Sequence, residues 1–414
     1  MQHNRRVGSR LTVVGLLMVA VGVASAGRAE GSAPPSYRLN IDLTSDEFTI
    51  LEVDESGLIG SPDGHVTFIR EGGVVRFWAP LAGGKTVELL TTDIVDLHAA
   101  SDPPVIVLGP SGGSNLDSEY AGGSKVLRLS GGRLAMLYQG ENHACGGDRA
   151  EVTIALATSD DDGATWQRQG AIITAPPWTF ASCADAMFYG AGSFSAVVSP
   201  DRQYLYVYFN QWLPDESGVT RVARSLISSG LGPGTWSKYY QGGWTQPGLG
   251  GRADDVLPVP ATERDLLERS VAIPTVSWNT TYHMWLAVYV TITGFWYSSS
   301  ADGLHWNPAE QLFGGVVLFA PESLVDHQQY IYYPSLVDPL ADEDGRTSET
   351  GILLYAQGGW TAAHHMVART VDISREELPP LPATGSSRWP LVLAACFVTV
   401  GLLLRRSATT PARR

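Results

Sequence analysis

The residues best suited to acid–base chemistry lie close together in the first half of the chain, at Tyr138, Glu141 and His143. A carboxyl group beside such neighbours can be partly desolvated, which raises its pKa and keeps it protonated. Hydrolysis of a glycosidic bond needs one protonated carboxyl as the acid and a second, ionised carboxyl as base or nucleophile. We therefore predict Glu141 as the acid and Asp117 or Asp185 as its partner, although aspartates in loops also commonly cap turns.

Further side chains in the predicted loops are suited to holding a ligand. Aromatic rings present flat apolar faces that can stack on sugars, although tryptophans also fill cores. The predicted substrate-binding residues are His143, Arg252, Tyr332 and Trp360. No metal or cofactor is predicted. The acidic run Asp342-Glu343-Asp344-Gly345 lacks the spacing of a calcium loop and is interpreted as a solvated turn.

The elements that must position these residues repeat along the chain. Trp166, Trp236 and Trp306 are spaced by 70 residues, and each follows a strand-like run and a Ser/Gly-rich turn. Runs rich in Tyr, Val and Leu precede them at Leu134–Tyr138, Leu205–Phe209 and Trp285–Tyr289, with a fourth at Ile352–Ala356. Upstream of those lie Ser124–Leu129, Ser193–Val198, Ala272–Trp278 and Tyr332–Val337, and a weaker first copy spans Val66–Leu90.

Short strands, turn signals and a long repeat are typical of an all-β repeat protein. Four strands per repeat predict a β-propeller with five blades, or six as the alternative, with residues 37–60 closing the ring. Ligands of such folds bind where the innermost strands converge, at one end of the central channel. The candidate residues above lie next to the predicted inner strands or follow the strand beside them.

One turn carries a recognisable motif, with Ser159, Asp161, Gly163, Thr165 and Trp166 in order. It resembles the Asp-box of sialidase-like propellers, which implies a structural role for Asp161 and Trp166 rather than a catalytic one. The later copies are weaker. The copy ending at Trp306 is aligned with Ser299 and Gly303 and has Ala301 where the Asp is expected, and the copy ending at Trp236 keeps Ser229.

From about residue 60 to 375 the blade pattern resembles the five-bladed glycoside hydrolases of the arabinanase and xylosidase clans. That resemblance implies two Asp and one Glu on the channel floor, for which Asp117, Asp185 and Glu141 are the candidates. A sialidase is less favoured, because the chain has no Arg-Ile-Pro segment. The alternative to an enzyme is a non-catalytic, carbohydrate-binding or adhesin propeller, since propellers host both functions.

The two ends of the chain are predicted to be targeting signals. Residues 1–26 combine a basic start, the apolar run Leu11–Val23 and the small residues Ala24-Ser25-Ala26, which is typical of a secretory signal. Residues 375–388 are a Pro-rich stalk that holds the pentapeptide 381–385. An apolar segment, 389–404, and a basic tail, 405–414, follow it.

This order resembles the cell-wall sorting signal of Gram-positive bacteria, which implies processing by sortase and attachment to peptidoglycan. The residues that carry the resemblance are Leu381, Pro382, Thr384 and Gly385, and cleavage is expected between the last two. The predicted protein is therefore extracellular, held in the membrane before sorting and attached to the wall afterwards. A plain C-terminal membrane anchor is the alternative.

Charge and cysteine content narrow the remaining possibilities for the domain at 27–374. Residues 1–26 and 385–414 together hold eight of the 28 cations and none of the 42 acids, so residues 27–384 carry 20 cations against 42 acids, a net charge of −22. Such a charge disfavours nucleic acid as a partner. Cys145 and Cys183 are a possible disulfide pair outside the cell. We expect a monomeric ectodomain with a carbohydrate ligand.

Overall fold

The computed structural model describes residues 37–51, 62–97, 103–143, 149–177, 188–213, 216–263, 271–315, 317, 330–358 and 364–378. All of them belong to one compact unit, Ser36–Arg414. Strands dominate the described residues, and the only helices among them are two short 3-10 turns, η2 (Ile227–Ser229) and η3 (Ala261–Glu263). No helix in the described ranges is long and apolar enough to cross a membrane.

The strands form successive antiparallel runs, and the strands of all but the last run follow one another in sequence order. The first run is β3 (Thr67–Glu71), β4 (Val74–Leu81), β5 (Lys85–Thr91) and β6 (Val105–Leu108), and the second is β7 (Tyr120–Arg128), β8 (Leu134–Asn142), β9 (Ala150–Ser159) and β10 (Gln167–Ile173). The third is β11 (Phe188–Val198), β12 (Tyr204–Leu213), β13 (Glu216–Leu226), β14 (Ser237–Tyr240) and β15 (Gly243–Pro247). The fourth is β16 (Ala272–Asn279), β17 (Met284–Thr291), β18 (Gly294–Ser300) and β19 (Glu310–Gly314), with β21 (Arg346–Thr347) beside β16.

The last run combines both ends of the described chain. It consists of β20 (Tyr330–Val337), β22 (Thr350–Gly358), β23 (His364–Glu377) and β1 (Tyr37–Leu43), and β2 (Phe48–Leu51) also pairs with β23. Tyr37 lies opposite Glu377 in the antiparallel register. The predicted closing role of residues 37–60 is thus seen for β1 and β2, whereas residues 52–61 lie outside the described ranges.

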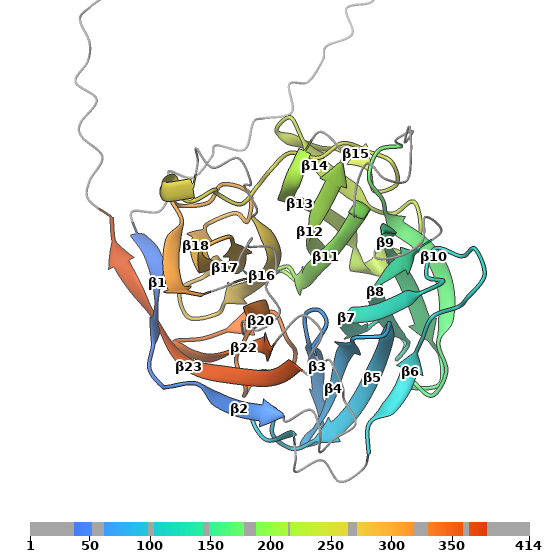
Figure 1. The fold of residues 1–414 in the computed structure, drawn as a ribbon, viewed down its shortest axis with the longest axis horizontal. Helices are drawn as coiled ribbons and strands as arrows, with labels where there is room; N and C mark the ends of the chain where they lie inside the picture. Colours follow the sequence, from blue (N-terminus) through green and yellow to red (C-terminus); the bar gives the residue numbers. More distant parts are fainter. Residues whose placement is uncertain are drawn as a thin grey trace, which may run out of the picture. The chain divides into compact units, whose positions relative to one another are not determined.

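Figure 1 shows the runs arranged around a common centre, with β3, β7, β11, β16 and β20 innermost. The arrangement follows from strand chemistry, because the middle strands are apolar on both faces and must be covered on both sides by neighbouring sheets. All residues of β17 are buried, for example. The fold is therefore an all-β, propeller-like one, and the predicted middle and inner strands each overlap an observed strand.

Hydroxyl side chains join the innermost strands of neighbouring runs. The main-chain N–H of Val126 donates to Thr67 Oγ1 (3.1 Å), and that of Val276 donates to Ser195 Oγ (3.1 Å). The same contact is made by Leu336 on Thr275 (3.3 Å) and by Val66 on Ser335 (3.2 Å), which links the last run to the first. Lys125 takes the place of this hydroxyl in β7. There β11 instead pairs directly with β9 in parallel, through Phe188–Gly190 and Ala150–Val152.

Each of the inner strands β7, β11, β16 and β20 carries a bulge just before this position. Ser193, Ile273 and Tyr333 adopt positive φ there (40°, 50° and 54°), which is unfavourable for residues other than glycine. Bulges of this kind re-aim side chains and are frequent beside functional sites. These strained residues are therefore candidates for the lining of a functional site.

The acidic run 342–345 is not the solvated turn expected from the sequence. Asp344 is buried, and its Oδ1 accepts hydrogen bonds from Lys125 Nζ (2.9 Å) and Thr67 Oγ1 (2.6 Å). Glu343 pairs with Arg202 (2.8 Å). The run therefore connects the first three runs of strands to the last one, which the local composition did not reveal.

The motif turn at Asp161 has the expected structural chemistry. Asp161 accepts hydrogen bonds from the main chain and the hydroxyl of Thr165, and these lower its pKa to about 2. The alignment of the Trp306 copy was wrong by one residue. The carboxylate there is Asp302, which accepts from Ser300 Oγ (3.1 Å) and from the His305 N–H (2.8 Å), so a shorter turn takes the place of the one aligned on Ala301.

Candidate active site

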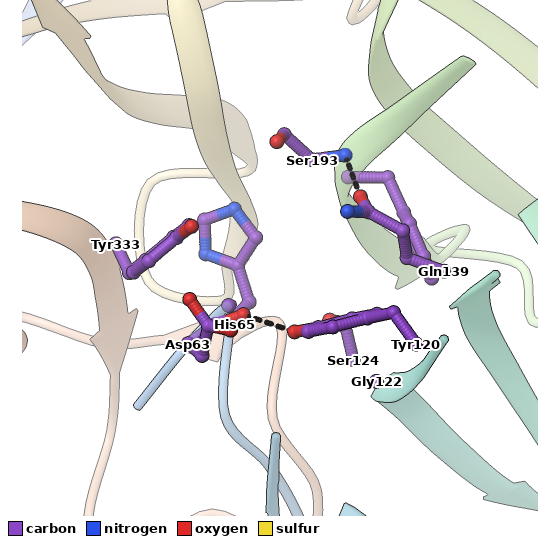
Figure 2. A pocket seen from close by; sticks show the side chains of 10 residues that line it. Asp63, His65, Tyr120, Gly122, Ser124, Gln139, Ser193 and Tyr333 are labelled. Carbon is purple, nitrogen blue, oxygen red and sulfur yellow. Dashed lines mark hydrogen bonds between the residues drawn. The ribbon is translucent and has the colours of Figure 1, made fainter. Parts of the chain in front are cut away.

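A small polar pocket lies where the inner strands converge. Residues before β3 and on β7, β8, β11 and β20 line it: Asp63, Gly64, His65, Tyr120, Gly122, Ser124, Gln139, Ser193, Phe194 and Tyr333. Figure 2 shows Asp63 and His65 across from Gln139, with the Tyr120 hydroxyl directed at the main chain of Asp63. Its enclosed space of about 10 Å³ matches a single water molecule.

Asp63 is the carboxyl group at this pocket. Desolvation by burial and repulsion from Glu141 raise its pKa to about 7, although hydrogen bonds with Tyr333 and Tyr120 act in the opposite direction. The Tyr120 hydroxyl also donates to the Asp63 main-chain carbonyl (2.6 Å), which holds the segment before β3 against β7. A carboxyl that keeps its proton near neutral pH is suited to general acid catalysis.

Glu141 comes from β8, directly opposite Tyr120 of β7 in the strand register. Its two carboxylate oxygens contact different partners. Gln139 Nε2 donates to Oε1 (2.7 Å), and His143 Nε2 lies 2.8 Å from Oε2. Its side chain is 12% exposed, and its charge contributes to the raised pKa of Asp63. Glu141 is not among the residues that line the pocket, and it is linked to them by its charge effect on Asp63 and its hydrogen bond with Gln139.

His65 presents an acceptor to the pocket. Its Nδ1 lies 2.7 Å from the carbonyl oxygen of Pro334, which can only accept, so Nδ1 carries the proton. Burial lowers the pKa of His65 to about 4, so the ring is neutral at pH 7. Nε2 is buried and has no hydrogen-bond partner among the described residues. A hydroxyl group of a ligand can donate to it.

The opposite wall is held by Gln139 and the bulge of β11. The main-chain N–H of Ser193 donates to Gln139 Oε1 (2.5 Å), while the amide nitrogen of Gln139 holds Glu141. The positive φ of Ser193 turns that N–H toward Gln139. One strained residue on β11 thus orients an amide on β8, and the amide orients the second carboxylate.

The structure places the other predicted residues as follows. Asp117 is buried in the second run, and its Oδ2 accepts from Arg168 Nε (2.6 Å) and the Tyr138 hydroxyl (3.1 Å), so it does not line the pocket. Arg252 is exposed after β15 and does not line it either. Tyr332 is buried and does not line the pocket, and its ring packs against Tyr333 with centroids 4.9 Å apart. Several predicted residues lie outside the described ranges: Asp185, Trp360, Cys145, Cys183, Leu381, Pro382, Thr384 and Gly385.

Sequence reasoning missed Asp63 and His65, because they precede the weakest repeat. A signal was nevertheless present. The hydroxyl residues Thr67, Ser195, Thr275 and Ser335 recur at the same place in their inner strands, two residues after each bulge or its counterpart. Ser193 and Tyr333 lie two residues before the hydroxyl residue of their strands, and His65 lies two residues before Thr67. All three residues line the pocket.

Comparison with known proteins gives similarity at the level of structure only. No protein-family model matches the chain, and no curated protein matches it significantly in sequence. An α-L-arabinofuranosidase from Lactobacillus brevis is 15% identical, with a TM-score of 0.48 over 75% of this chain and 91% of that one. The catalytic domain of a GH62 α-L-arabinofuranosidase from Coprinopsis cinerea is 14% identical, with a TM-score of 0.47 over 81% and 98%.

A family 117 glycoside hydrolase from the marine bacterium Zobellia galactanivorans is 11% identical, with a TM-score of 0.47 over 81% of this chain and 90% of that one. Identities this low carry no activity or substrate over to this chain.

Proposed function

We propose that this protein is a glycoside hydrolase with Asp63 and Glu141 as its carboxyl pair. The observation that supports it is the polar pocket lined by Asp63, His65 and Gln139, in which burial and the charge of Glu141 on β8 raise the pKa of Asp63. Pairs of titratable groups whose environments differ in this way are characteristic of acid–base sites. Glu141 was predicted as the acid, and the electrostatics favour Asp63 for that role instead.

In the proposed reaction Asp63 gives its proton to the glycosidic oxygen as the bond to the anomeric carbon breaks. Ionised Glu141 assists the incoming water by accepting its proton, or attacks the anomeric carbon itself. The sugar rests at the mouth of the pocket, because the enclosed space matches only one water molecule. His65 Nε2 accepts a hydrogen bond from a sugar hydroxyl, and Gln139 holds Glu141 in place.

The test uses residues 27–384 with the variants Asp63→Asn and Glu141→Gln. Reducing-end release is measured on neutral polysaccharides and aryl glycosides, including arabinofuranosides. Each variant is expected to lose at least a hundredfold in rate. Asp160→Asn, at an exposed carboxylate paired with Arg133, is the matched control and should keep full activity. If both variants still released reducing ends at the wild-type rate, Asp63 and Glu141 would not be the catalytic carboxyl pair.

The small enclosed space also favours a second candidate, a carbohydrate-binding propeller without catalysis. It predicts retention on a glycan with no release of reducing ends, and retention that survives Asp63→Asn. The same panel separates the two candidates, because only the hydrolase shortens its ligand.

We further propose that each of the five runs of strands is one blade, and that the protein is displayed on a cell wall. The support for display is the order of the stalk, the pentapeptide 381–385, the apolar segment and the basic tail. Mass spectrometry of protein released from purified walls should find a C-terminal peptide that ends at Thr384. A peptide that continues through Gly385 would contradict sorting.

A further inference from the structure

A second pocket lies on the outer part of the third run and shares no lining residue with the candidate active site. Arg224 of β13 stacks on Tyr204 of β12 and on Trp244 of β15, with its guanidinium carbon 4.4 and 4.3 Å from the two ring centroids. Its Nη1 donates to the Tyr206 hydroxyl (3.1 Å). The aromatic contacts hold the guanidinium group in one orientation, and most of its donors stay available along its edge.

The space beside Arg224 has the size and lining of a ligand site. The depression measures about 450 Å³, within the range of known small-molecule sites. Hydroxyl side chains of Ser225, Ser229, Thr235 and Ser237 line it together with Arg224, Tyr204 and Trp244, and no acidic side chain does. It accommodates one or two sugar rings, whose hydroxyls find polar partners in this lining.

The turn at the edge of this depression lacks the acid present in its relatives. In the second and fourth runs, Asp161 and Asp302 accept the hydrogen bonds of the equivalent turns. In the third run Ser225 Oγ instead contacts Thr235 Oγ1 (2.8 Å), and Leu231 occupies the position that corresponds to Asp161 by spacing from the tryptophan.

The positive charge of Arg224 is therefore left without a carboxylate partner among the described contacts. The carboxylate of Asp201 is influenced by Arg224, but its hydrogen bonds are made with Ser199 Oγ (2.5 Å) and the Gln203 N–H (3.1 Å).

We propose that this depression binds a carboxylate-bearing sugar, such as a hexuronic acid residue of a polysaccharide, with Arg224 pairing with the carboxylate. A planar guanidinium group binds carboxylates through two parallel hydrogen bonds. A single arginine matches a single negative charge, and the hydroxyl-rich lining matches the remaining groups of a sugar. The site is built from β12, β13, β14 and β15 and does not depend on the proposed hydrolase activity.

The test is calorimetric titration of residues 27–384 with oligogalacturonate and with its neutral methyl ester. Binding of the acid form, at least tenfold tighter than the ester and weakened by salt, is expected. Arg224→Gln should remove that preference, and Trp244→Ala should weaken both. Arg133→Gln is the matched control at an exposed arginine and should bind as the wild type does. The melting temperature of each variant shows whether it is folded.

Three results would overturn the proposal. Equal affinity of the wild type and Arg224→Gln would remove the arginine from the site, and equal affinity for the acid and ester would remove the carboxylate. Preference for a sulfated oligosaccharide or an acidic peptide over oligogalacturonate would assign a different ligand. Asp63→Asn is expected to bind oligogalacturonate as the wild type does. Failure of the hydrolase assay would therefore not affect the outcome of this binding test.

Discussion

At the scale of single residues, Asp63 connects activity with stability. Its pKa of about 7 lies above the ordinary value, so the folded protein holds a proton there that the unfolded chain releases between about pH 4 and pH 7. The folded state therefore loses stability as the pH rises through that range. Below pH 4 Asp63 is protonated in both the folded and the unfolded state, so it adds nothing to the pH dependence of stability.

We expect Asp63→Asn to raise the melting temperature relative to the wild type at pH 8 by several degrees, and by much less at pH 4. Thermal unfolding of both proteins across this pH range measures the difference, with Asp160→Asn as the control at an exposed carboxylate. A difference that stays constant with pH would show that Asp63 does not titrate as described. Wild-type hydrolysis should decline above about pH 7 as Asp63 ionises.

Ser193 offers a second test at the residue scale. Its φ of 40° costs a non-glycine residue about 1–2 kcal/mol, and a glycine at this position would avoid that cost. Glycine loses more chain entropy on folding, which takes back about 0.5–1 kcal/mol of the gain. We expect Ser193→Gly to stabilise the protein by about 0.5–1 kcal/mol in urea unfolding. Ser195→Gly, two residues further on, should destabilise it, because Ser195 Oγ accepts the N–H of Val276. Stabilisation by both would mean that backbone strain is not specific to the bulge.

At the scale of elements, the run 342–345 makes a buried ion pair with β7 of the second run. Lys125 Nζ contacts the Asp344 carboxylate (2.9 Å) and its main-chain carbonyl (3.2 Å), and Lys125 is fully buried. Removing one partner of such a pair leaves an uncompensated buried charge, at a cost of about 3–5 kcal/mol. Desolvation by burial raises the pKa of Asp344, so protonation absorbs part of that cost.

We expect Lys125→Met to lower the free energy of unfolding by about 3 kcal/mol, and Lys125→Met combined with Asp344→Asn to lower it by less. Urea titration measures both. Lys85→Met, at an exposed lysine, is the control and should change stability by less than about 0.5 kcal/mol. A double variant with a lower free energy of unfolding than Lys125→Met alone would show that the two side chains act independently.

Strand positions were predictable because alternation and turn residues are local signals. The runs around Leu134–Tyr138 and Trp285–Tyr289 fall within β8 and β17. Turn length was less predictable, since one residue fewer before Trp306 moves the carboxylate to Asp302. Glu141 and His143 were found together because they lie on one stretch of chain. Asp63 and Glu141 belong to separate runs of strands. No local feature of the sequence shows that the fold brings the charge of Glu141 to act on Asp63.

At the scale of the whole molecule, β1 completes a sheet begun at the other end of the chain. Its Leu39 and Ile41 are buried in the core that the last two runs share. Deleting residues 27–43 would expose these contacts and leave residues 371–377 of β23 without their partner strand, and an unpaired edge favours association between chains. We expect this truncation to self-associate and to melt at lower temperature, as measured by light scattering after gel filtration. A stable monomer would show that β1 does not secure the fold.

The pairing of Tyr37 with Glu377 also decides how the domain would carry mechanical load. β23 is hydrogen-bonded to β22 along Thr350–Gly358 on one side and to β1 along Tyr37–Leu43 on the other. A pull applied to the chain beyond Glu377 would run along β23, so these bonds would resist it in shear and share the force instead of opening one by one. For a protein tethered by its C-terminal side in flowing liquid, the last strand is then a clamp rather than a zipper.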